Sequence, residues 1–396
     1  MRSEPMPEFD VAVVGGGVAG LATALGCAQQ GLRVALLGPR PALRTATEPA
    51  PYDLRIYAVA PASVALLERL GVWGRIDLAR VEPVLRMRVF AGNEDREAEL
   101  SFDAYGAQVE RLATIVEESE LLRVLDAACD FQPAIARLEA RFEALATDRS
   151  GATVRLADGN GLRARLVVGA DGGNSGVRAA AGIRSDLKPY GQTAIVSNFA
   201  CERPHLGAAW QWFTPEGITA LLPLPGQRVS LVWSAPETLA ARLAQLSPSE
   251  LAARVTLRSH AVLGELSPLG PAAGFPLRLM TVQRVVGERL VLVGDAAHIV
   301  HPLAGQGLNL GLQDVADLLR VLREREAFRE LGDTVLLRRY ERARAEPVAL
   351  MRATTDGLAR LFAIDDAVVD RVRGLGFSIA NRLAPLKRAL IRQALG

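Results

Sequence analysis

A glycine cluster near the N-terminus constrains the fold of this chain more than any other feature. The apolar run at 9–14 predicts a buried strand, residues 18–30 predict a helix, and residues 33–37 predict a second strand. Between the first strand and the helix lie three glycines at the GxGxxG spacing, which are Gly15, Gly17 and Gly20. A strand–turn–helix–strand unit of this length predicts a parallel sheet.

Each glycine of this cluster has a physical reason to lack a side chain. Gly15 permits the tight turn, Gly17 lets a pyrophosphate approach the backbone, and Gly20 lets the helix and the strand pack closely. The first turn of the helix then offers unpaired N–H groups and the positive end of its dipole to phosphates. The spacing predicts a dinucleotide site, with an ordinary glycine turn as the alternative. The acid expected after the second strand, for the ribose hydroxyls, is replaced by Gly38.

Length and composition exclude several classes of protein. The chain has 396 residues, 49% of them hydrophobic and 23% charged, which fits a folded protein with two intertwined domains. A formal net charge of +2 gives no reason to expect nucleic acid as a partner. The three cysteines are far apart and predict neither a disulfide framework nor a metal site. The sequence contains no apolar run of about 18 residues, so it predicts no membrane-spanning helix.

The remaining patterns predict an α/β protein whose nucleotide-binding domain is interrupted by a second sheet. Short strand-like runs separated by Gly and Pro turns fill residues 192–234, and a buried strand and long helices return from residue 290 onward. We expect a Rossmann-like domain, an inserted mixed β-sheet domain that binds the substrate, and C-terminal helices. The predicted divisions are 1–183, with a sheet insertion near 84–103, then 184–275, 276–330 and 331–396.

Two further motifs place acids at the ends of buried strands. Asp171 and Gly172 follow one such strand, and the alternative role of Asp171 is to cap the next helix. Asp295 follows a later buried strand, where an acid can bind a ribitol hydroxyl. Gly305 and Gly307 then bring the start of a long helix against a flat ligand, and that helix end can stabilise negative charge on the ligand.

Two other groups of side chains allow more than one role. His298 and His301 have a spacing that suits two metal ligands, but no third ligand cluster accompanies them and Pro302 indicates a loop. We therefore expect no metal. Trp210 and Trp212 alternate on a predicted strand. Core packing accounts for one face of that strand, and the other face can line a pocket for an aromatic substrate.

The chain resembles a known family through three motifs in a fixed order. These are GGGVAG, GADGGNSGVR and GDAAHIVHPLAGQGLNLGLQD, and they resemble the motifs of the class A flavoprotein monooxygenases, whose prototype is para-hydroxybenzoate hydroxylase. Further segments are similar to the ubiquinone-biosynthesis hydroxylases of the UbiH, UbiF and UbiI group: DLRIYAVAPASVALLERLGVW, YGQTAIVSNF, WFTPEGITALLPLP and the tail LGFSIANRLAPLKRALIRQALG. The resemblance covers essentially the whole chain and implies the fold of the para-hydroxybenzoate hydroxylase type.

Carried over residue by residue, this resemblance completes a set of expected site residues. Those expected to bind FAD are Gly15, Gly17, Gly20, Gly38, Arg55, Asp171, Gly172, Asp295, Gly307, Leu308 and Asn309. Those expected where substrate and oxygen meet are Pro302, Gly305 and Gln306. Those expected to contact the substrate are Trp210, Trp212, Leu222 and Pro223.

The resemblance also implies a chemistry. NAD(P)H reduces FAD, the reduced flavin adds oxygen to form a C4a-hydroperoxide, and a phenolic ring attacks the distal oxygen. The implied substrate is a polyprenylated phenol on the way to ubiquinone. Two departures bear on FAD affinity: Gly38 stands where family members usually carry Glu or Asp, and Glu117-Glu118-Ser119 stands where they often read ENR. We therefore expect weak FAD binding.

Other functions and contacts stay open at this point. One alternative is a hydroxylase of a soluble phenol, and another is a non-catalytic flavin-fold subunit of a quinone-biosynthesis complex. The basic amphipathic helix predicted at 379–396 can dock on an anionic membrane or a partner, or pack on the domain with solvated arginines. We expect a cytoplasmic location, with peripheral contact at the inner membrane left open. The hydroxylated ring carbon, the choice between NADH and NADPH, and the oligomeric state do not follow from the sequence.

Overall fold

The computed structural model describes most of the chain. The described residues are 6–42, 51–91, 98–301 and 305–363. Pro302 and the docking helix predicted at 379–396 lie outside these residues. No helix in the described ranges is long and apolar enough to cross a membrane.

The first sheet is built on parallel strands, as the glycine motif predicts. Its main order is β18 (Val286–Gly287), β19 (Leu290–Leu292), β11 (Gly161–Gly169), β1 (Glu8–Val14), β2 (Val34–Leu37) and β8 (Ile135–Leu138). All neighbours from β19 to β8 are parallel, and β18 is antiparallel at the edge. The central strands carry apolar side chains on both faces because both faces are covered.

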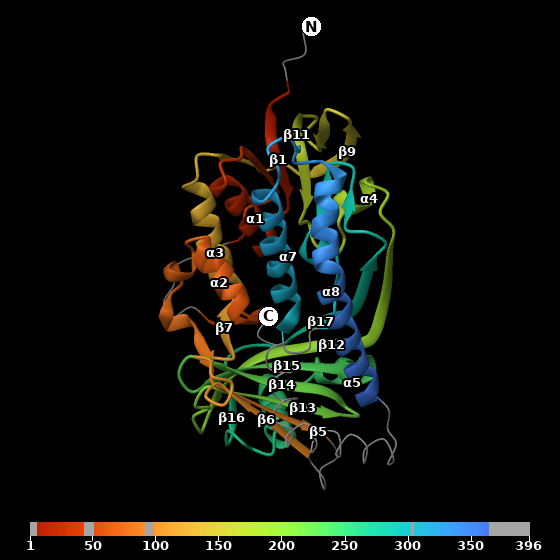
Figure 1. Ribbon diagram of the computed structural model, residues 1–396. Coiled ribbons are helices and arrows are strands. Elements are labelled where there is room, and N and C mark those ends of the chain that lie inside the picture. Colours follow the sequence, from red (N-terminus) through yellow and green to blue (C-terminus); the bar gives the residue numbers. More distant parts are fainter. Residues whose placement is uncertain (1–5, 43–50, 92–97, 302–304, 364–396) are drawn as a thin grey trace.

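Helices cover one face of this sheet and an antiparallel hairpin covers the other (Figure 1). The helices are α1 (Val18–Gln29), α2 (Pro61–Arg69), α3 (Glu118–Asp130), α7 (Gln306–Arg323) and α8 (Thr334–Ala363). The opposite layer consists of β9 (Phe142–Asp148), β10 (Gly151–Leu156) and the short α4 (Gly176–Ala180). The elements expected at 9–14, 18–30 and 33–37 are confirmed to within one residue at each end.

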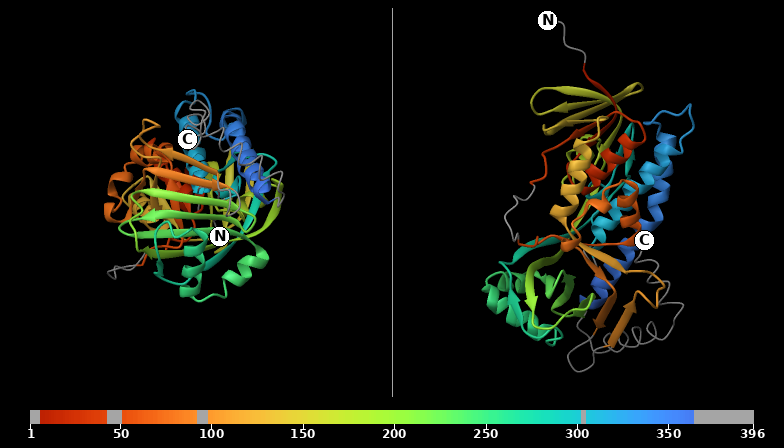
Figure 2. Two further views of the ribbon diagram at one scale, coloured as in Figure 1. Left: turned by 90° about the horizontal axis from the view of Figure 1, so that it is seen from below. Right: turned by 90° about the vertical axis from the view of Figure 1, so that its left-hand side faces the viewer.

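A second sheet lies at the opposite end of the molecule from the β9–β10 hairpin (Figure 2). Its order is β16 (Leu266–Pro268), β12 (Ser185–Cys201), β15 (Arg228–Pro236), β14 (Gly217–Leu224), β13 (Ala208–Thr214), β5 (Arg86–Ala91) and β6 (Ala98–Asp103), and β17 (Ala273–Val282) also pairs with β12. The pairing is antiparallel except between β13 and β5. The sheet insertion expected near 84–103 therefore joins this second sheet.

Smaller elements connect the two sheets. A three-stranded sheet contains β3 (Ile56–Val59), β7 (Ala113–Glu117) and β4 (Glu82–Val84). Helices α5 (Glu237–Leu243) and α6 (Pro248–Arg258) cover the second sheet on its outer face. Three short 3₁₀ turns complete the described elements: η1 (Trp73–Arg75), η2 (Leu78–Arg80) and η3 (Gly294–Ala296).

The two faces of the second sheet separate core from cavity. Trp212 and Trp233 are almost completely buried in the apolar core beneath α5 and α6. Neighbouring positions along each strand point the other way because side chains alternate along a strand. The inner face, which carries Gln211, therefore looks toward the first sheet.

Candidate active site

A cavity of about 890 Å³ lies at the carboxyl ends of the parallel strands. The chain leaves β1 at Gly15, β2 at Gly38, β11 at Ala170 and β19 at Val293, and all four residues line this cavity. The chain runs from β1 to β2 on one side and returns to β11 on the other. The cavity thus lies where the strand order reverses, which is where open α/β sheets bind their ligands.

The three glycines of the first motif play different structural parts. A Cβ added to Gly15, which has φ +129°, would lie 2.1 Å from the Ala170 carbonyl oxygen. A Cβ on Gly20 would lie 2.0 Å from the Gly15 carbonyl oxygen, so Gly20 permits close packing and does not line the cavity. Nothing lies within 4 Å of a Cβ added to Gly17. Gly17 therefore keeps open the space in front of α1.

Two helices present their N-termini to this cavity. Gly17 is the N-cap of α1 and Gly305 is the N-cap of α7, and neither provides a capping side chain. Neither helix has an acid in its first turn. The first N–H groups of both helices therefore have no side-chain acceptor at the cap, and the positive ends of both dipoles favour an anionic ligand.

Asp171 of the second motif lines the cavity and also stabilises the local fold. The Ser175 hydroxyl donates to Asp171 Oδ1 at 2.5 Å, and the Val177 N–H donates to Asp171 Oδ2 at 3.1 Å. Asp171 thereby stabilises the start of α4, much as the capping alternative proposed. Asp171 and Gly172 nevertheless both line the cavity.

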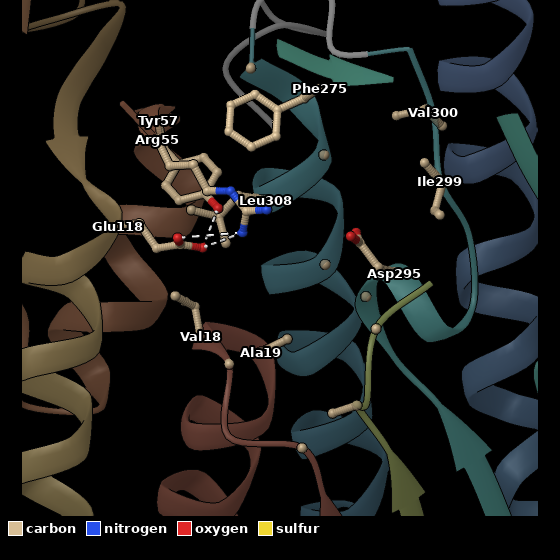
Figure 3. A pocket seen from close by; sticks show the side chains of 18 of the residues that line it. Val18, Ala19, Arg55, Tyr57, Glu118, Phe275, Asp295, Ile299, Val300 and Leu308 are labelled. Carbon is tan, nitrogen blue, oxygen red and sulfur yellow. Dashed lines mark hydrogen bonds and ion pairs between the residues drawn. The ribbon is translucent and has the colours of Figure 1, made fainter. Parts of the chain in front are cut away.

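A charged cluster occupies one side of the cavity (Figure 3). Arg55 lies 3.4 Å from Glu118, and the Tyr57 hydroxyl donates to Glu118 Oε1 at 2.8 Å. The Arg55 guanidinium also lies 5.4 Å from the ring centre of Phe275, which the second sheet contributes. Burial raises the pKa of Tyr57, and the Glu118 carboxylate adds to this shift. Tyr57 is therefore neutral at physiological pH, and its hydroxyl keeps the proton that it donates to Glu118.

The residue before Glu118 explains how the cluster is positioned. Glu117 is fully buried, and both of its oxygens bind the Arg80 guanidinium, at 2.6 and 2.9 Å. Its Oε1 also accepts the Asp53 N–H at 2.6 Å, and Asp53 Oδ2 accepts the Ser119 N–H at 2.8 Å. These bonds tie the segment that carries Arg55 to the start of α3.

Asp295 lies across the cavity from this cluster (Figure 3). The Asp295 side chain is surrounded by protein but keeps its surface open to the cavity. This enclosure raises the pKa of Asp295, and the nearby His298 opposes the shift. Gly305, Gly307 and Leu308 line the cavity beside it at the start of α7.

Asn309 and Gln306 lie apart from the cavity wall. Asn309 is buried; its Oδ1 accepts the Ala60 N–H at 2.8 Å and the Ser63 hydroxyl at 2.9 Å, and its Nδ2 donates to the Ala58 carbonyl at 2.8 Å. Asn309 thus fastens the β3–α2 connection to α7. Gln306 is the first residue of α7 and does not line the cavity.

The second sheet supplies the apolar wall of the cavity. Leu222 lines this wall, whereas Pro223 points elsewhere. Trp210 and Trp212 pack in the core under α5 and α6, because the alternation of β13 turns them away from the cavity. The residue between them, Gln211, lines the cavity instead. The sequence alone does not single out Gln211, although alternation along the strand places it on the face opposite to the two tryptophans.

The backbone conformation of Gly38 disfavours the acidic residue that related proteins usually carry at this position. Its φ is +139°, which disfavours residues with a side chain, and an added Cβ would lie 3.3 Å from the Gly16 nitrogen. Gly38 lines the cavity. An acidic side chain at this position would therefore strain the turn after β2.

The two histidines of the third motif have separate partners. His298 Nε2 lies 2.7 Å from Asp314 Oδ2, and His301 Nε2 lies 3.0 Å from Gln192 Oε1. Burial lowers the pKa of His301 to about 4. Among the described residues, no group of three or more His, Cys, Asp and Glu side chains is arranged to hold a metal ion.

Comparisons with known proteins agree with this geometry. A family model described as an FAD binding domain matches residues 8–354. The ubiquinone hydroxylase UbiL of Rhodospirillum rubrum is 39% identical over 391 residues, covering 98% of this chain and 89% of that protein. The 3-demethoxyubiquinol 3-hydroxylase of Escherichia coli is 35% identical over 395 residues, covering 98% of each.

The solved structure of p-nitrophenol 4-monooxygenase PnpA from Pseudomonas putida has the same fold, with a TM-score of 0.77 at 21% identity over 99% of each chain. The chain therefore belongs to the FAD binding domain family and, within it, to the FAD-dependent ubiquinone-biosynthesis hydroxylases.

Proposed function

We propose that this protein uses NAD(P)H and O₂ to hydroxylate the aromatic ring of a polyprenylated phenol in ubiquinone biosynthesis. Family membership supports FAD-dependent hydroxylation. The names of two relatives, a ubiquinone hydroxylase and a 3-demethoxyubiquinol 3-hydroxylase, support the substrate class. The observation that carries the proposal is a single cavity that joins a dinucleotide crevice to the apolar face of a second sheet.

The residues of the crevice fit FAD. The open space at Gly17, the N-terminus of α1 and the guanidinium of Arg55 would hold the pyrophosphate. Asp295 would accept hydrogen bonds from ribitol hydroxyls, and Leu308 would contact the flavin. The cavity of about 890 Å³ is of the size that ligand sites have, which is roughly 300–1,000 Å³.

When bound, FAD would accept electrons from NAD(P)H and activate O₂. The chain itself binds, orients and excludes water. The N–H groups at the start of α7 stabilise negative charge on a ligand against Leu308. The apolar wall that includes Leu222 and Phe275 keeps water from the reacting ring and suits a hydrophobic substrate.

An assay of product formation tests this proposal. The purified protein, with added FAD, is supplied with NADH or NADPH and with a phenol that carries a short prenyl chain, and products are analysed by mass spectrometry. We expect the phenol to gain one oxygen atom. Hydroxylation of phenols without any preference for a prenyl chain would favour a soluble substrate. A protein that binds no FAD at any concentration would favour the non-catalytic subunit.

Contact with a membrane or a quinone-biosynthesis complex remains part of the proposal, because a polyprenylated substrate must be delivered from one of these. The segment 379–396 is the proposed contact, on the basis of its basic and apolar pattern. Removing it is expected to weaken the association of the protein with anionic vesicles while leaving FAD binding unchanged. Unchanged association would leave the segment with a structural role only.

A further inference from the structure

One long polar side chain lies among apolar neighbours on the inner face of the second sheet. Gln211 lies in the middle of β13, is 5% exposed and lines the cavity. Within the described residues, its side-chain amide makes no hydrogen bond. An amide that faces a cavity can form hydrogen bonds with the molecule that fills it, so Gln211 is a candidate to bind a polar group of a ligand there.

The surroundings of Gln211 make it stand out. The residues that the second sheet contributes to the cavity wall are Ala194, Val196, Gln211, Ile218, Ala220, Leu222, Val232, Ser234, Phe275 and Leu277. Only Gln211 and the small hydroxyl of Ser234 are polar in this set. A ligand oxygen that reaches this wall therefore finds one long side chain able to bind it.

The register of the sheet leaves room beside the amide. Gln211 lies directly opposite Ala220 on β14, and Ala220 lies opposite Val232 on β15. Directly opposed side chains in an antiparallel pair are close neighbours, so the short side chain of Ala220 leaves space next to the Gln211 amide. A flat ring can occupy that space while its oxygen meets the amide.

We infer that Gln211 binds the oxygen substituent of the aromatic substrate and so decides how the ring is presented to the flavin. A neutral amide suits this task because its N–H donates to a phenol or methoxy oxygen and its carbonyl accepts from a phenol O–H. It places no charge in an apolar wall. Gln211 is thus a specificity-determining residue for an oxygenated ring with an apolar tail, and this inference rests on the function proposed above.

The test compares ligands that differ only in this oxygen. FAD-loaded protein is titrated with 2-prenylphenol, with its methyl ether and with prenylbenzene, and binding is followed by flavin fluorescence. We expect the wild type to bind the phenol about tenfold more tightly than prenylbenzene, with the ether between them. Gln211→Met keeps the length of the side chain but removes both hydrogen-bonding groups, and it should reduce this preference to within about twofold.

Controls separate a lost contact from a damaged fold. Gln245→Leu also replaces a glutamine by an apolar residue, but on the exposed surface, and it should keep the wild-type ligand preference. FAD affinity and melting temperature of Gln211→Met should match those of the wild type. In turnover, Gln211→Met should divert a larger share of NAD(P)H electrons to hydrogen peroxide, because a misoriented ring is hydroxylated less efficiently.

Each outcome bears on one claim. Wild-type preference for the phenol in Gln211→Met would overturn the role of Gln211 and leave the proposed function intact. Failure of the wild type to bind any prenylated ligand would overturn the substrate class, and the role of Gln211 with it. If Gln211→Met loses FAD or melts early, Gln211→Asn decides instead: it keeps the amide but withdraws it by one methylene, and a full wild-type preference there would contradict the inference.

Discussion

Gly17 offers the sharpest test at the scale of a residue, because a side chain fits there without disturbing the protein. Gly17→Asp has no backbone obstacle, yet it places a carboxylate where a pyrophosphate would lie. We expect FAD binding to weaken by on the order of a hundredfold, which is about 2.7 kcal/mol. Titration of the apoprotein with FAD measures this. Gly74→Asp is the matched control, since Gly74 also has open space but lies outside the cavity.

Gly38 shows how backbone conformation limits a substitution that seems favourable. An acid at this position would be near the ribose hydroxyls, but the φ of +139° strains any residue with a side chain. We expect Gly38→Glu to lower the free energy of unfolding by roughly 1–3 kcal/mol, measured by urea unfolding. Gly38→Ala should show the same loss without the charge. A Gly38→Glu protein of wild-type stability that binds FAD about tenfold more tightly would contradict this expectation.

Glu118 places a negative charge on the wall of a site that is expected to take a pyrophosphate. Its carboxylate also holds Arg55 at 3.4 Å, in competition with the ligand. Glu118→Gln keeps an acceptor for the Tyr57 hydroxyl and releases Arg55, so we expect FAD to bind about three- to fivefold more tightly. Glu110→Gln, which alters a surface pair with Arg111, should leave FAD affinity unchanged. Weaker binding by Glu118→Gln would mean that the carboxylate accepts hydrogen bonds from FAD.

At the scale of elements, Asp314 joins three segments in the interior. Asp314 on α7 accepts the Gly294 N–H at 2.9 Å, contacts His298 at 2.7 Å and binds the Arg344 guanidinium of α8 at 2.6 Å. Burial acts to raise the pKa of Asp314, but His298 and Arg344 hold it below its ordinary value. Their contribution to stability is therefore present above the ordinary pKa of about 3.9 and is lost as the pH falls through the lower folded value.

Asp314→Asn would remove the fully buried carboxylate that pairs with Arg344 and leave only the partly exposed Asp317. We expect the free energy of unfolding at neutral pH to fall by about 3–5 kcal/mol, which urea unfolding can measure. Asp317→Asn provides the comparison, because Asp317 pairs with Arg320 and Arg344 at the partly exposed rim and should cost less than about 1 kcal/mol. Equal losses in the two variants would show that burial of the network contributes little.

At the scale of the whole molecule, one cavity is shared by the parallel sheet and the second sheet. A ligand that fills it contacts both, so binding should stabilise the molecule as a unit. FAD at about one hundred times its dissociation constant should add about 2.7 kcal/mol to the free energy of unfolding. A single melting transition that moves to higher temperature is the expected result. At the same FAD concentration the gain in Gly17→Asp should shrink to about 0.4 kcal/mol, because its affinity is expected to be about a hundredfold weaker. Two transitions of which only one moved would contradict the coupling.

The sequence was sufficient for features that depend on neighbouring residues. The structural roles expected for Gly15 and Gly20, the adjoining strand and helix, and the α/β class are confirmed, because close backbone approaches demand glycine and apolar periodicity demands a particular element. The FAD-dependent hydroxylase family is confirmed as well. Each of these signals is a short segment or motif, so it can be recognised without knowing which distant residues lie nearby in the fold.

The tertiary structure decided which side chains face the cavity. Trp210 and Gln211 are adjacent, and only the apolar core that covers one face of the second sheet takes the tryptophan inside and leaves the glutamine facing the cavity. Likewise, Glu118 meets Arg55, and Asp314 meets Arg344, across distances in sequence that no local pattern spans. Alternation along a strand tells which residues share a face, but the layers packed on the two faces determine which face becomes the site.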